Sequence, residues 1–129
     1  TLNGWQGKYS VFIQNKITMK AASSGLTNEE KLKLQRQLQF AFDYALDLLV
    51  RDINGQLKPI EKRKMDAVNI GPAAMKFEPT VLEEAHSKIV IRSFPPYFNE
   101  TVSVSNGGVI AINECDVKVK GIKKACINE

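Results

Sequence analysis

One long helix with a marked beginning and end is the feature that most restricts how this 129-residue chain can fold. Thr27 and Glu30 have the spacing of a capping box, in which each side chain accepts a hydrogen bond from the backbone N–H of the other residue. Asn54 and Gly55 supply a left-handed stop after the last apolar position. The interval predicts a helix of about 25 residues, roughly 38 Å long at 1.5 Å per residue.

The apolar residues of this helix predict which side faces the core. One stripe recurs at spacings of three and four: Leu34, Leu38, Ala41, Ala45 and Leu49. Asp43, Asp47 and Arg51 lie four residues apart on a line that we expect to face water. The second half of the helix carries more apolar surface than packing on one sheet requires. We therefore expect a central helix held by a curved sheet, and a helix shared with a partner subunit is the alternative.

Strand patterns lie on both sides of the helix. Residues 9–20 alternate between apolar and polar types, as a half-buried strand does. Residues 88–94, 101–105 and 109–113 predict further strands, and Asn106–Gly107 predicts a two-residue hairpin turn. Residues 56–86 are less regular, although Thr80 and Glu83 repeat the capping-box spacing of a short helix. This order predicts a single α+β domain over residues 1–129, with the long helix packed on an antiparallel sheet.

The spacing of the two cysteines indicates how the C-terminal strands are joined to each other. A turn at Lys120–Gly121 pairs Val119 with Ile122 and brings Cys115 opposite Cys126, which favours a cross-strand disulfide. Such a bond requires an oxidising compartment, so we expect a secreted or periplasmic protein. Two free buried thiols are the alternative. Metal or redox chemistry is disfavoured, because two cysteines and one histidine fall short of a zinc ligand set and the C-x-x-C spacing is absent.

Lysines crowd the same predicted hairpin. The register places Lys118 opposite Lys123, with Lys120 and Lys124 nearby, and like charges facing each other across a ladder are destabilising. An acidic protein partner would reverse that cost, so these four lysines are our candidate partner-binding residues. The alternative is a solvated sheet edge, where lysines deter aggregation.

The sequence contains few signs of catalysis. His86 lies near Glu83 and Glu84, but no serine or cysteine nucleophile can be assigned to it from the spacing. No glycine-rich phosphate loop, cofactor motif or metal-ligand set is present, so we expect a protein without catalytic residues or cofactors. Asn99–Glu100–Thr101 has the pattern of an N-glycosylation acceptor. The first residue, Thr1, indicates either a removed signal or an excised domain.

Composition narrows the remaining function classes. The chain is 43% apolar and 25% charged, typical of a folded protein, and no stretch has the roughly twenty apolar residues that a membrane span needs. The net charge of +4 is mild, and the basic residues around Arg63 lack interleaved aromatics, which disfavours nucleic acid. We predict a secreted or periplasmic protein-interaction module. The alternatives are a carrier of a small lipophilic ligand and an anion or nucleic-acid binder that works through its lysine clusters.

Overall fold

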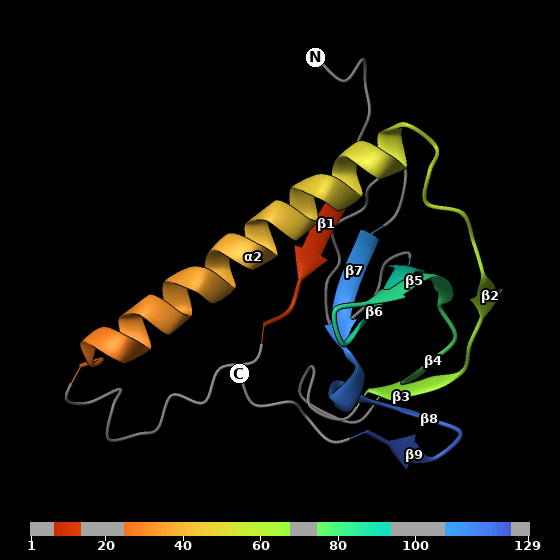
Figure 1. The fold of residues 1–129 in the computed structure, drawn as a ribbon. Coiled ribbons are helices and arrows are strands. Elements are labelled where there is room, and N and C mark those ends of the chain that lie inside the picture. Colours follow the sequence, from red (N-terminus) through yellow and green to blue (C-terminus); the bar gives the residue numbers. More distant parts are fainter. Residues whose placement is uncertain (1–6, 14–24, 68–74, 94–107, 125–129) are drawn as a thin grey trace.

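One helix and two sheets stack in three layers in the computed structural model, which describes residues 7–13, 25–67, 75–93 and 108–124 (Figure 1). The helix α2 (Asn28–Ile53) lies against one face of a five-stranded sheet, here the large sheet. The strand order of the large sheet is β1 (Lys8–Val11), β7 (Gly108–Asn113), β6 (Lys88–Ser93), β5 (Thr80–Ala85) and β2 (Glu61–Lys62). The predicted α+β class is confirmed.

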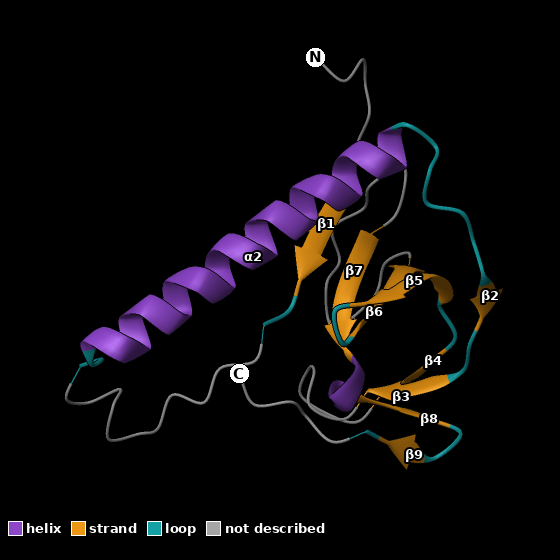
Figure 2. Ribbon diagram, viewed as in Figure 1, coloured by secondary structure: helices purple, strands orange, loops and turns teal. Residues whose placement is uncertain are grey.

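A second sheet, here the small sheet, packs against the other face of the large sheet. Its strand order is β4 (Met75–Phe77), β3 (Met65–Ala67), β8 (Val117–Val119) and β9 (Ile122–Lys123), all antiparallel. A short 3-10 helix, η1 (Glu114–Asp116), connects the two sheets between β7 and β8, as Figure 2 shows.

The large sheet is buried on both faces at β7, which lies between β1 and β6. Val109 and Ala111 point towards α2, where they meet Leu48 and Leu82. The alternate residues of β7 face the small sheet and join a core that includes Met65. This explains why the sequence of β7 reads as a continuous apolar run rather than as an alternation of apolar and polar residues.

The predicted ends of the helix are confirmed. Thr27 is the N-cap: its side-chain oxygen accepts from the N–H of Glu30 at 3.1 Å, and the Glu30 carboxylate accepts from the N–H of Thr27 at 2.9 Å. The bond from the Thr27 backbone holds the pKa of Glu30 below its ordinary value. Gly55 follows the C-cap with a φ of 71°, the left-handed conformation that the stop requires.

The predicted buried stripe of the helix was wrong. The buried positions are Tyr44, Leu48 and Asp52, whereas Leu38 is 53% exposed and Leu49 is only partly buried. No residue between Asn28 and Asp43 is fully buried, because the N-terminal half of α2 extends past the described sheets (Figure 1). The C-terminal half alone makes the core contacts. The position of the large sheet therefore determines which face of α2 is buried, and helical spacing alone does not.

Two further predictions about the sheet need correction. The sheet is mixed rather than antiparallel, because β1 runs parallel to β7. Thr80 and Glu83 lie in the strand β5, not at the start of a helix, and β5 pairs with β6. Val81 belongs to the core on the small-sheet side and Leu82 to the core beside α2, so the strand buries both residues because both of its faces are covered.

An irregularity in β5 determines where Glu83 points. The register with β6 shifts between Val81 and Glu83, so Leu82 is the extra residue of a β-bulge. After the shift Leu82 packs towards α2, and Glu83 bonds to Tyr44 and Arg51 of α2. The bulge therefore brings a carboxylate to the side of the sheet that the helix covers.

The C-terminal hairpin has the predicted register. Lys118 pairs with Lys123 and Val119 with Ile122, around left-handed residues Lys120 and Gly121. Cys115 lies in η1 and is buried, rather than in a strand as expected. Cys126 lies outside the described residues, so its pairing with Cys115 stays a prediction. Residues 14–20, Asn99, residues 101–105 and the Asn106–Gly107 turn also lie outside them.

Candidate functional site

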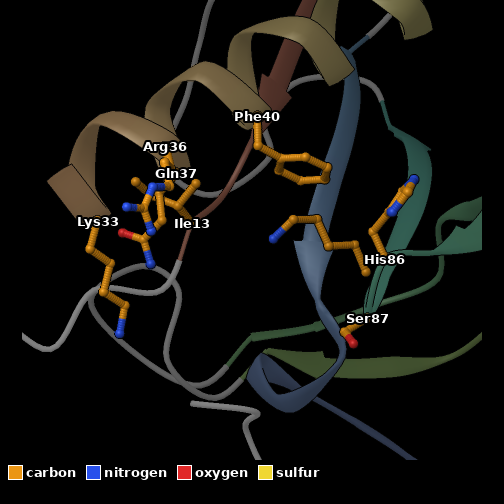
Figure 3. Close-up of a pocket in the computed structure, with 8 residues that line it drawn as sticks. Ile13, Lys33, Arg36, Gln37, Phe40, His86 and Ser87 are labelled. Atoms are coloured by element: carbon orange, nitrogen blue, oxygen red, sulfur yellow. The ribbon is translucent and has the colours of Figure 1, made fainter. Parts of the chain in front are cut away.

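A cavity of about 560 Å³ opens between the N-terminal half of α2 and the turn that joins β5 to β6 (Figure 3). We call it the basic groove. It brings together three distant parts of the chain, and the described residues that line it are Ile13, Lys33, Arg36, Gln37, Phe40, His86, Ser87 and Lys88. Several of them are basic and none is acidic. The groove therefore offers a positively charged, partly apolar surface.

Arg36 differs from the other arginines in that it forms no ion pair within the described part of the chain. Arg51, Arg63 and Arg92 each form an ion pair with a carboxylate of the same chain. Neither Arg36 nor its groove neighbour Lys33 forms one with a described residue. The two positions are three residues apart, so they share one side of the helix. No carboxylate among the described residues therefore neutralises either charge.

One end of the groove is aromatic. The Phe40 and His86 rings meet edge to face with centroids 5.3 Å apart, and the rings of Tyr44 and His86 meet in the same way at 5.0 Å. His86 and Ser87 both have positive φ, at 56° and 58°. They form the two-residue turn between Ala85 and Lys88, where such conformations normally favour Asn-Gly.

Lys88 is a buried cation beside this groove. Its ammonium donates to the backbone carbonyl of Phe12 and to the side-chain oxygen of Asn113. Asn113 in turn donates to Asp116 at 3.0 Å. These bonds link the segment after β1 to β6, β7 and η1, and they fix the inner side of the groove.

A second feature is an exposed apolar line on α2, which we call the α2 stripe. Its members recur every four residues: Leu38 (53% exposed), Phe42 (65%), Leu46 (48%) and Val50 (49%). Leu46 and the buried Leu48 are two positions apart, and at about 100° per residue they point to nearly opposite sides of the helix. The α2 stripe therefore faces away from the large sheet.

Two polar contacts fix the C-terminal half of α2 on the large sheet. Arg51 binds both oxygens of Glu83, at 2.6 and 3.0 Å, and the Tyr44 hydroxyl donates to Glu83 at 2.6 Å. The bonds from Arg51 hold the pKa of Glu83 below its ordinary value. Burial, reinforced by the bond to Glu83, raises the pKa of Tyr44.

Asp52 makes the second of these contacts. Its carboxylate pairs with Arg92 of β6 and accepts from the Tyr9 hydroxyl of β1 at 2.7 Å. Asp52 is buried, and the guanidinium and hydroxyl compensate the loss of water around its charge. The apolar periodicity of the helix does not predict this role. Asp52 is a charged residue, yet it lies on the same buried face as Tyr44 and Leu48.

The predicted partner-binding lysines lie in the small sheet, on the other side of the large sheet from α2 (Figure 1). The register confirms Lys118 opposite Lys123, and it also places Asp66 of β3 opposite Lys118. Lys124 lies 3.6 Å from Glu114. The chain thus supplies carboxylates beside the hairpin, and opposite charges across a ladder are stabilising. Partner binding by Lys118, Lys120, Lys123 and Lys124 stays a prediction.

His86 is the one sequence candidate that belongs to the basic groove. It is exposed and lies on the turn of a hairpin. Sequence reasoning missed Lys33, Arg36 and Phe40 as a group. Their spacing on α2 was visible, but their proximity to His86 depends on how the hairpin meets the helix.

Comparisons with known proteins give no further indication: no family model, curated protein or solved structure matches the chain. No helix in the described ranges has the length and apolar character to cross a membrane. Within the same ranges, no three His, Cys, Asp or Glu side chains gather as they would around a metal ion.

Proposed function

We propose that this protein is a secreted or periplasmic interaction module without catalytic activity, and that a helix of a partner protein packs along the α2 stripe. The observation that carries the proposal is the exposure of four large apolar residues in one continuous line. Isolated apolar residues are common on protein surfaces, but contiguous apolar patches mark interaction sites.

The spacing of the α2 stripe suits a helical partner. Residues that recur every four positions form one of the ridges by which helices interlock at interaxial distances of about 8–10 Å. From Leu38 to Val50 the ridge is about 18 Å long at 1.5 Å per residue. Phe42 is its most exposed member, and aromatic residues often provide much of the binding energy at protein interfaces.

The fold holds this surface ready for binding. The contacts of Glu83 and Asp52 fix the half of α2 that carries Leu46 and Val50. A surface that is already ordered loses less conformational entropy when a partner binds. These contacts therefore support binding without a rearrangement of α2.

Photochemical crosslinking tests the α2 stripe directly. We replace Phe42 with photoreactive benzoylphenylalanine and irradiate the protein in an extract of its native source. We expect a discrete protein adduct, identified by mass spectrometry, that disappears when Leu46→Gln is added in the same chain. A homodimeric adduct supports the proposal as well, because the partner is then a second copy.

The matched control places the same photoreactive residue at Glu29, which is exposed in the first turn of α2. Glu29 is about 20 Å along the helix from Phe42 and points about 140° away from it, at 1.5 Å and 100° per residue. This position should give no discrete adduct. An equal yield at both positions, or no adduct at Phe42, would show that the α2 stripe is not a binding surface.

The predicted disulfide supports the proposed location. We propose that Cys115 and Cys126 are joined in the native protein, because the hairpin that separates them in sequence has the register from which the pairing was predicted. Intact-mass measurement without reductant should give a mass two hydrogens below that of the dithiol. Two alkylatable thiols in freshly isolated protein would contradict both the bond and the argument for an oxidising compartment.

A further inference from the structure

We propose that the basic groove is a binding site for a small organic anion, in which a carboxylate or phosphate group is attached to an apolar body. The site is separate from the α2 stripe, and the proposal does not depend on the proposed protein partner. It rests on charge, on shape and on the conformation of the turn that closes the groove.

Charge is the first argument. Arg36 and Lys33 face the groove without an ion pair to a described residue, while every other arginine of the chain has a carboxylate partner. A guanidinium presents its donors in a planar fork that matches the two oxygens of a carboxylate or phosphate. Lys33, three residues away, supplies a second charge to the same anionic group.

Shape is the second argument. The volume of about 560 Å³ falls within the range of about 300–1,000 Å³ that is typical of small-molecule sites. Phe40 and Ile13 form an apolar wall beside the two cations. Figure 3 shows Phe40 between Arg36 and His86. An anion without an apolar part would leave these side chains in water, whereas a neutral apolar molecule would leave the cations unpaired. An amphipathic anion satisfies both.

The turn gives a third, independent argument. His86 and Ser87 adopt left-handed conformations that favour asparagine and glycine and are unfavourable for other residues. Both residues line the groove. Unfavourable backbone conformations are concentrated at binding sites, where they hold side chains in place. The turn thus keeps the polar side chains of His86 and Ser87 at the groove, although Asn-Gly would be the more stable sequence in this conformation.

Titration calorimetry with four probes tests the proposal. Decanoate and decyl phosphate carry the anionic group on an apolar chain and distinguish the two anion types; decanol has the chain alone, and inorganic phosphate the charge alone. We expect at least one amphipathic anion to bind at least tenfold more tightly than decanol and inorganic phosphate. Equal binding of decanol, or of inorganic phosphate, would overturn the proposal.

Variants then locate the site. Arg36→Gln and Lys33→Gln should each weaken binding of the amphipathic anion by about tenfold without a change in thermal midpoint, because both side chains are exposed. Lys31→Gln is the matched control: it removes an exposed lysine of the same helix that does not line the groove, and it should leave the affinity unchanged. Phe42→Gln should also leave it unchanged, because Phe42 belongs to the α2 stripe.

A double variant separates binding from folding. His86→Asn with Ser87→Gly gives the turn the sequence that its conformation favours, so we expect a higher thermal midpoint together with weaker anion binding. A loss of stability would overturn the argument from the turn. Unchanged affinity in Arg36→Gln, or lost affinity in Phe42→Gln, would place the anion outside the basic groove and overturn the assignment.

Discussion

Replacing Leu48 with alanine is expected to lower the free energy of unfolding by about 2–5 kcal/mol, through lost transfer energy and the cavity left behind. Leu48 is fully buried and packs between α2 and the large sheet, beside Leu82, Val90 and Ala111. These neighbours belong to three adjacent strands of the large sheet, β5, β6 and β7, and the paired strands limit how far this site can collapse. We therefore expect a loss in the upper part of the range. Urea denaturation followed by circular dichroism measures the change.

Leu46→Ala is the matched control for this prediction. It makes the same chemical change two positions away on the same helix, so its effect on helix propensity is similar. Because Leu46 is on the exposed α2 stripe, we expect a change within about 0.5 kcal/mol. Equal losses in the two variants would mean that the faces of α2 are assigned wrongly.

Replacing Glu83 with glutamine is expected to cost about 1.5–3 kcal/mol, the usual contribution of hydrogen bonds to charged groups. Its carboxylate is the common acceptor for Arg51 and Tyr44, so the change weakens three bonds between β5 and α2 at once. Asp47→Asn is the control: it removes the exposed partner of the same arginine, and we expect less than about 1 kcal/mol.

The contribution of Glu83 depends on pH in a direction that its bonds determine. Its pKa is lower in the folded protein than the ordinary value of 4.5, so the unfolded chain takes up the proton first as the solution becomes acidic. The stabilisation is fully present above pH 4.5 and is lost as the pH falls through the lowered pKa. The difference in unfolding free energy between wild type and Glu83→Gln should therefore shrink below pH 4.5. A constant difference down to pH 2.5 would contradict this role of the carboxylate.

The sequence by itself determined the elements that depend on neighbouring residues. Both ends of α2 follow from Thr27, Glu30 and Gly55, whose hydrogen bonds and backbone conformation act within one helical turn. The register of β8 and β9 follows in the same way from the two-residue turn between them. Strands β6 and β7 are recognisable because their apolar runs are too short and too β-branched to favour a helix.

The tertiary structure decided which of several locally permitted arrangements forms. Thr80 and Glu83 satisfy a helix-capping pattern, yet pairing with β6 makes them a strand because it buries Val81 and Leu82. Apolar residues surround the second half of α2, and the large sheet covers the face of Leu48 while leaving Phe42 exposed. The basic groove joins residues from separate parts of the chain, and the availability of Arg36 depends on which carboxylates the fold brings near it. Local bonds fix the elements, whereas long-range burial and charge pairing determine which surfaces remain for binding.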